Sequence, residues 1–127
     1  MARGIRTKKK ILIVEDDREL GDALQERLKK EGYDVQISPN GEGLPEKSVR
    51  FRPDLILLDL NLPKRSGFLG LSDLKGNMET EGIPVCIITI RTDTPSWERG
   101  YGQGAAAYIV KPFDMSELVK RIKMLTR

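Results

Sequence analysis

The chain has 127 residues, 39% hydrophobic and 32% charged, which is the balance of one globular domain. No apolar run approaches the roughly 20 residues that a membrane-spanning helix needs, which excludes an integral membrane protein. The net charge of +3 arises at the start of the chain, where residues 1–10 hold five basic side chains and no acidic one. We therefore expect a flexible basic leader at 1–9 and one mildly acidic domain at 10–127.

Two further features of the composition narrow the chemistry. The chain has no histidine, which excludes Ser-His and Cys-His catalytic pairs and a histidine-ligated zinc site within it. Its one cysteine, Cys86, cannot form an internal disulfide, which fits a reducing cytoplasm, where we expect the protein. The few charges of the leader bind phosphate weakly at physiological salt, so we expect no direct binding to nucleic acid.

Short apolar runs alternate along the chain with segments that repeat apolar residues every three to four positions. The runs predict strands, in chain order, at residues 10–14, 35–38, 55–58, 85–89 and 107–110. The segments between and after them predict helices at residues 18–31, 45–51, 67–77, 94–103 and 115–125. The last helix has the clearest start, because Asp114 is a good N-cap and Glu117 follows three residues later.

The third and fourth strands indicate how the sheet is built. Residues 55–58 read LILL and residues 85–88 read VCII, without the alternation of a half-exposed strand. Both faces of these strands should therefore be covered, as in a parallel sheet. Strands that alternate with helices form right-handed βαβ units. The prediction is an α/β domain, a doubly wound five-stranded parallel sheet with helices on both faces.

The residues at the carboxyl ends of the predicted strands carry the chemistry, because ligands bind at that edge of an open α/β sheet. In chain order these residues are Glu15, Asp16, Asp17, Asp59, Thr89 and Lys111. Neighbouring carboxylates repel one another, and a hard cation with oxygen ligands, typically Mg²⁺, would neutralise them. Lys111 and Thr89 can hold the oxygens of a transferring phosphoryl group, and Asp59 can form an acyl phosphate.

Four segments, ILIVEDD, DLILLDLNLPKRSG, IPVCIIT and GAAAYIVKPF, contain these residues in order. With them, residues 10–126 resemble the response-regulator receiver domain of two-component signalling and bacterial chemotaxis. The resemblance implies a flavodoxin-like strand order of 2-1-3-4-5. It also implies a phosphoprotein that acts as a conformational switch, and no enzyme activity beyond its own phosphotransfer and autodephosphorylation.

The resemblance assigns roles around the phosphorylation site. Asp59 would be the phosphoacceptor, and Lys111 and Thr89 would contact its phosphoryl group. Four residues would bind Mg²⁺: Glu15, Asp16, Asp59 and, through its backbone carbonyl, Asn61. Pro63 and Gly67 would form the turn of the loop that follows.

The resemblance also implies how the signal leaves the site. Thr89 and Tyr108 would be the switch residues, and the Lys111–Pro112 peptide bond would be cis. A histidine kinase or a phosphotransfer protein would supply the phosphoryl group. A downstream effector domain or protein would bind the face formed by the fourth helix, the fifth strand and the fifth helix.

Three features depart from the family's pattern. Ile90 follows Thr89 where the family usually has a small residue, and its bulk should narrow access to Asp59. Glycines at 100, 102 and 104 are unfavourable within a helix, so we expect the fourth helix to be short, shifted or mobile. Pro45 and the residues before it similarly shorten the second helix. These features place the transmission of the signal in question more than the phosphorylation itself.

Two other functions stay open from the sequence. One is a pseudo-receiver, a protein-interaction module that keeps the fold but is not regulated by phosphorylation. The other is a Mg²⁺-dependent phosphohydrolase with an aspartyl nucleophile, which needs an acid/base group two residues after Asp59, where Asn61 cannot serve. Among the remaining residues, we interpret Asp17 as a helix N-cap, Cys86 as a buried apolar residue and Trp97 as a partly exposed packing residue.

Overall fold

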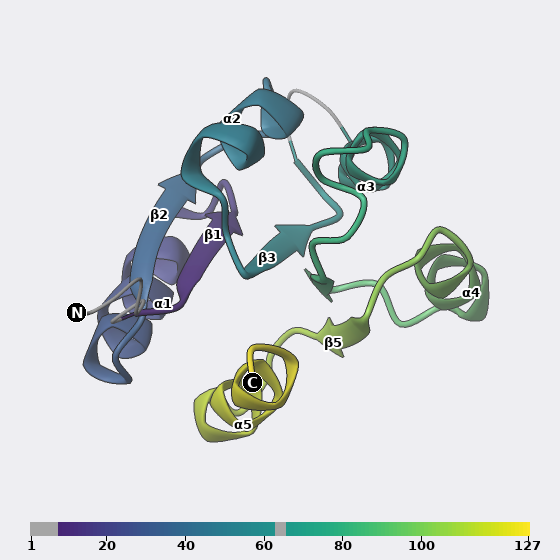
Figure 1. Cartoon of the computed structure of the whole chain (residues 1–127). Coiled ribbons are helices and arrows are strands. Elements are labelled where there is room, and N and C mark those ends of the chain that lie inside the picture. Colours follow the sequence, from purple (N-terminus) through teal and green to yellow (C-terminus); the bar gives the residue numbers. More distant parts are fainter. Residues whose placement is uncertain (1–7, 63–65) are drawn as a thin grey trace.

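A parallel sheet of five strands forms the centre of the molecule in the computed structural model, which describes residues 8–62 and 66–127 (Figure 1). The strands are β1 (Lys10–Val14), β2 (Asp34–Ser38), β3 (Leu55–Asp59), β4 (Val85–Thr89) and β5 (Ala107–Val110). Their order in the sheet is β2-β1-β3-β4-β5, and every neighbouring pair is parallel. The predicted fold class and strand order are confirmed.

Five helices connect the strands and follow the last one. They are α1 (Arg18–Lys30), α2 (Leu44–Phe51), α3 (Gly67–Lys75), α4 (Thr94–Gly102) and α5 (Met115–Leu125). The helices α1 and α5 cover one face of the sheet, and α2, α3 and α4 lie on the other (Figure 1). Among the described residues, no helix is long and apolar enough to cross a membrane.

The apolar core consists of two layers, one on each face of the sheet. Alternate residues of β3 enter different layers, since Leu55 and Leu57 pack with α1 and α5 while Ile56 and Leu58 pack with α2 and α3. Every residue of β3 and β4 is buried, including Cys86. Because helices cover both faces, neither strand needs a polar side, which explains the unbroken apolar runs in the sequence.

Short-range hydrogen bonds set the ends of the helices. The carboxylates of Asp17 and Asp114 cap α1 and α5 by accepting from Leu20 N (3.2 Å) and Glu117 N (3.1 Å), as predicted. The helix α3 ends two residues earlier than predicted, with Gly76 as its C-cap. Residues 1–7, most of the expected leader, lie outside the described residues, so the division at residue 9 stays a prediction.

The glycines of α4 neither shorten nor shift it, contrary to expectation, because the helix covers nearly the whole predicted range, and its expected mobility stays a prediction. Gly100 is buried within it, and a Cβ atom there would lie 2.8 Å from Ile87 Cδ1 and 3.2 Å from Tyr108 Cδ2. The missing side chain therefore lets α4 lie close against β4 and β5. This contact offsets the low helix propensity of glycine, a compensation that the sequence alone does not reveal.

Candidate functional site

Three carboxylates meet at the carboxyl edge of the sheet. One oxygen atom each from Glu15, Asp16 and Asp59 lies within 4.8 Å of the other two. Glu15 and Asp16 directly follow β1 and Asp59 ends β3, and these two strands are neighbours in the sheet. Glu15 and Asp59 are 1% and 4% exposed, whereas Asp16 is open to solvent. The sequence therefore predicted correctly that these three residues lie together.

Lys111 reaches this cluster from the end of β5. Its Nζ donates to Glu15 Oε1 at 2.6 Å and to Asp59 Oδ2 at 3.2 Å. The backbone N–H of Lys111 donates to the carbonyl of Thr89 at 2.7 Å, and the following bond to Pro112 is cis, as expected. One ammonium group thus bridges two nearly buried carboxylates from different strands.

The electrostatics of the cluster favour an additional positive charge. Burial raises the pKa of Glu15 to about 7, and the negative charge of Asp59 acts in the same direction, although hydrogen bonds from Lys111 and from the backbone N–H of Asp17 oppose them. Burial opposes the charge of Lys111, but its hydrogen bond to Glu15 and the charge of Asp59 leave its pKa raised. The cluster holds three carboxyl groups and one ammonium, which contacts Glu15 and Asp59, so it can accommodate a second cation.

A hard divalent cation fits this set of donors. Carboxylate oxygens are the ligands that Mg²⁺ prefers, and the exposed Asp16 leaves the cluster accessible to hydrated ions. Asp17 is not part of the cluster, because its carboxylate caps α1. Asn61 lies at the same edge, where its backbone N–H donates to Asp59 Oδ1 at 3.0 Å. Its expected role as a carbonyl ligand stays a prediction.

The two expected switch residues meet at a third residue, Arg91. The buried Thr89 accepts a hydrogen bond at Oγ1 from the backbone N–H of Arg91 at 3.1 Å. Tyr108 donates its hydroxyl to the carbonyl of Arg91 at 3.0 Å. The side chain of Arg91 also donates from Nε to Asn61 Oδ1 at 3.1 Å. Arg91 therefore contacts both switch residues and the loop after Asp59.

The sequence does not single out Arg91, although its position carries a signal. Arg91 lies two residues beyond Thr89, the last residue of β4, and Asn61 lies two residues beyond Asp59, the last residue of β3. Because β3 and β4 are parallel neighbours, with Asp59 paired to Ile88, the residues that follow the two strands lie near one another. An asparagine and an arginine shortly after two neighbouring strands were therefore a detectable pair.

The remaining predictions about this edge have different outcomes. Gly67 donates its N–H to the carbonyl of Leu60 at 3.0 Å, and a Cβ atom there would overlap the backbone of Asp59, so a glycine is required. Ile90 is 67% exposed, so its side chain is not packed into the core, and its effect on access stays a prediction. Pro63 lies outside the described residues.

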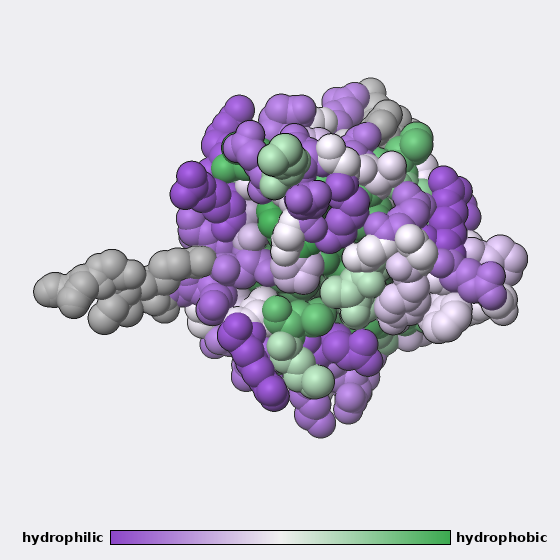
Figure 2. All heavy atoms as spheres, turned by 45° about the vertical axis from the view of Figure 1, so that its right-hand side comes forward, coloured by the Kyte–Doolittle hydropathy of each residue, from purple (hydrophilic) through white to green (hydrophobic). Residues whose placement is uncertain are grey.

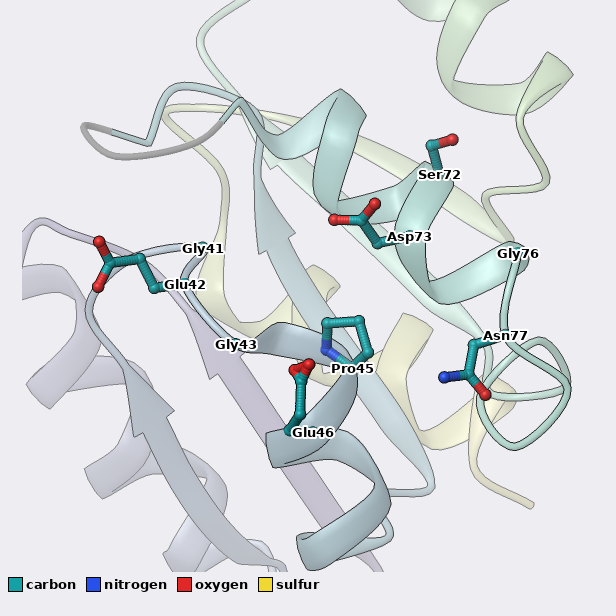
Figure 3. A pocket seen from close by; sticks show the side chains of 9 residues that line it. All are labelled: Gly41, Glu42, Gly43, Pro45, Glu46, Ser72, Asp73, Gly76 and Asn77. Atoms are coloured by element: carbon teal, nitrogen blue, oxygen red, sulfur yellow. The ribbon is translucent and has the colours of Figure 1, made fainter.

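A hollow between α2 and α3 lies away from the carboxylate cluster (Figure 3). It has a volume of about 700 Å³ and is lined by Gly41, Glu42, Gly43, Pro45, Glu46, Ser72, Asp73, Gly76 and Asn77. None of the residues predicted for the site lines this hollow. We therefore place the functional site at the carboxyl edge of the sheet.

Comparison with known proteins agrees with this placement. The chain is 42% identical over 118 residues to the response regulator ArlR of Staphylococcus saprophyticus, covering 93% of this chain and 52% of that protein. It is 37% identical over 118 residues to the DNA-binding dual master transcriptional regulator RpaA of Synechocystis, covering 93% and 49%. The chain thus spans about half the length of the curated relatives it matches.

Solved structures show the same fold. The BeF3-activated N-terminal receiver domain of Klebsiella pneumoniae RstA superimposes with a TM-score of 0.87 at 32% identity, covering 94% of this chain and 99% of that one. The chemotaxis response regulator CheY4 of Vibrio cholerae gives 0.86 at 26% identity, covering 94% and 99%. The family model of the response regulator receiver domain matches residues 11–123. The chain therefore belongs to the response regulator receiver domain family.

Proposed function

We propose that Asp59 is the phosphoacceptor of this receiver domain. The observation that carries the proposal is the bridge of Lys111 between Glu15 and Asp59, which places a fixed positive charge beside a nearly buried carboxylate at the edge where Asp16 opens to solvent. Receiver domains of two-component response regulators are signalling switches, and this arrangement supplies the groups that such a switch needs.

The residues divide the proposed reaction among them. A carboxylate oxygen of Asp59 forms a bond to phosphorus while the bond from phosphorus to the donor's nitrogen or oxygen breaks, and the donor keeps the bonding electrons. Lys111, which contacts Asp59 Oδ2, can pair with a phosphoryl oxygen once the carboxylate has been phosphorylated. Thr89 accepts a hydrogen bond from Arg91, so its own O–H remains available to donate to a second oxygen. Mg²⁺ held by Glu15, Asp16 and Asp59 would supply charge neutralisation.

The partners we propose follow from the family and from one surface. A histidine kinase, a phosphotransfer protein or a small phosphodonor would supply the phosphoryl group, in the cytoplasm.

A groove of about 800 Å³ runs between β5 and α5 and includes Tyr108, Phe113 and Met124 in its lining. On the face in Figure 2, hydrophobic surface lies in small areas between hydrophilic side chains. We propose the α4-β5-α5 face as the site of a downstream effector.

The two alternatives are less well supported. The pseudo-receiver is not favoured, because Asp59, Thr89 and Lys111 are all present and Lys111 already contacts Asp59. A phosphohydrolase would need an acid/base group two residues after Asp59, and Asn61 carries an amide there. We therefore propose that catalysis is limited to the domain's own phosphorylation and dephosphorylation.

Acetyl phosphate with Mg²⁺ tests the proposal. Intact-mass spectrometry should show one added phosphoryl group in the wild type and none in Asp59→Asn, because the amide cannot form the acyl phosphate. Ser66→Ala is a matched control, since it removes a nearby hydroxyl that caps α3. An equal mass increase in Asp59→Asn, or none in the wild type, would contradict the assignment.

A further inference from the structure

The start of α3 is pressed directly against the phosphorylation site. Gly67, its first residue, donates its N–H to the carbonyl of Leu60, and the space for a Cβ is occupied by the backbone of Asp59 and Leu60. No compressible side chain separates the two segments. A shift of the backbone at Asp59 must therefore be accompanied by a shift of Gly67 and of the next residue, Phe68.

Phe68 is in turn held by α4. Its side chain is 3% exposed, and the guanidinium of Arg99 lies 4.2 Å from the centre of its ring. Its carbonyl accepts a hydrogen bond from Gln103 Nε2 at 3.2 Å, and Arg99 Nε donates to Gln103 Oε1 at 3.0 Å. Arg91, from the loop before α4, lies over the same ring at 5.8 Å. The ring is thus bound from α4, and the backbone is bound from the C-cap residue of that helix, Gln103.

Two other contacts hold α4 to the domain: the Tyr101 ring lies 6.4 Å from that of Tyr108, and Gly100 lies against Ile87 and Tyr108. The buried residues of α4 are the small residues Ser96 and Gly100, while Trp97, Glu98, Arg99 and Tyr101 are exposed. Helices with few buried apolar contacts are the ones that move at low energetic cost. The cluster of Phe68, Arg99 and Gln103, which we call the Phe68 clamp, is therefore well placed to determine where α4 lies.

We propose that the Phe68 clamp couples the phosphorylation site to α4, in addition to the contacts of Thr89 and Tyr108 with Arg91. This inference rests on the proposed phosphorylation of Asp59. In this arrangement Arg99 and Gln103 are positioning residues: they touch no reacting atom, and they act through Phe68 and Gly67. A backbone shift at Asp59 moves the first turn of α3. The clamp passes this movement on to α4, which forms one side of the proposed effector face.

Beryllofluoride with Mg²⁺ provides the test, because it imitates the phosphoryl group on an aspartate. The response of α4 is read from the NMR shifts of the Trp97 indole and of the backbone amides of residues 94–98. Arg99→Ala and Gln103→Ala should each reduce this response by about twofold or more, the range expected when coupling between sites is weakened. Arg99→Lys keeps a cation for the ring and should retain most of the response.

The controls separate failure of this inference from failure of the proposed function. Glu98→Ala changes an exposed neighbour on the same helix and should respond like the wild type. All these variants should still gain one phosphoryl group on Asp59 from acetyl phosphate. An undiminished α4 response in both Arg99→Ala and Gln103→Ala, or an equal loss in Arg99→Lys, would overturn the role of the clamp while leaving phosphorylation intact. No mass increase in the wild type would instead overturn the proposed function.

Discussion

Lys111 lies between two carboxylates, Glu15 and Asp59, whose side chains are almost completely buried. Burying a charge is unfavourable unless the charge is paired, and each carboxylate here is paired with the same ammonium group. Lys111 therefore stabilises the fold in addition to its proposed role of holding a phosphoryl group. Its two roles are linked, because a cation or a phosphoryl group that enters the cluster changes the charge that Lys111 must balance.

Replacing Lys111 by methionine should lower the free energy of unfolding by about 2 kcal/mol without divalent cations, since two buried carboxylates lose their partner. The loss is less than is typical of a broken buried pair because Glu15, with its pKa raised to about 7, can take up a proton. Urea unfolding measures the difference, and added Mg²⁺ should recover much of it. Lys120→Met is the control, since Lys120 is 73% exposed and pairs only at the surface. Equal losses in both variants would contradict this account.

At the scale of whole elements, α4 shows how one glycine allows close packing. Gly100→Ala should reduce the free energy of unfolding by about 1–3 kcal/mol, because the new methyl group meets Ile87 and Tyr108. Gly102→Ala, in the same helix, meets nothing within 4 Å and should be neutral or stabilise by up to about 1 kcal/mol. Thermal unfolding of the pair measures both effects. If Gly100→Ala were as stable as Gly102→Ala, α4 would not need the close approach.

An ion-pair cluster joins α1 to α5. Glu31, the C-cap of α1, accepts from Arg27 Nε at 3.0 Å and lies 2.9 Å from Lys123 Nζ of α5. Hydrogen bonds from Lys123 and then Arg27 lower the pKa of Glu31. The ordinary pKa of this carboxyl group is 4.5, and its pKa in the folded protein is lower. The group therefore stabilises the fold at pH values above 4.5, and this stabilisation is lost as the pH falls through the pKa of the folded protein.

Glu31→Gln removes this charge and should melt at a lower temperature than the wild type at pH 7. The difference should shrink as the pH falls below 4.5, because the wild-type carboxyl is then protonated as well. Glu26→Gln, which breaks an exposed pair with Lys30, is the control and should show little difference at either pH. A gap between Glu31→Gln and the wild type that did not change with pH would argue against the cluster.

For the molecule as a whole, the sequence predicts most of the features that follow from the order of the strands. It predicts few of the contacts that depend on where a long side chain points. Asp59 and Lys111 could be placed together because Asp59 ends β3 and Lys111 directly follows β5 in a parallel sheet, where position follows from topology. The clamp on Phe68 could not be predicted, since it joins residues 35 apart through a ring and an amide whose directions only the packed structure sets. Gly100 was misjudged because helix propensity describes an isolated helix and not its neighbours.

The central claim is that Asp59 receives the phosphoryl group within a cluster completed by Lys111 and Thr89. Fluorine NMR of beryllofluoride, followed by a structure of the complex with Mg²⁺, tests it most directly. The account predicts one bound beryllofluoride on a carboxylate oxygen of Asp59, within hydrogen-bonding distance of Lys111 Nζ and Thr89 Oγ1, and no bound signal in Asp59→Asn. Beryllofluoride that bound equally well to Asp59→Asn, or that lay out of reach of Lys111 and Thr89, would contradict it.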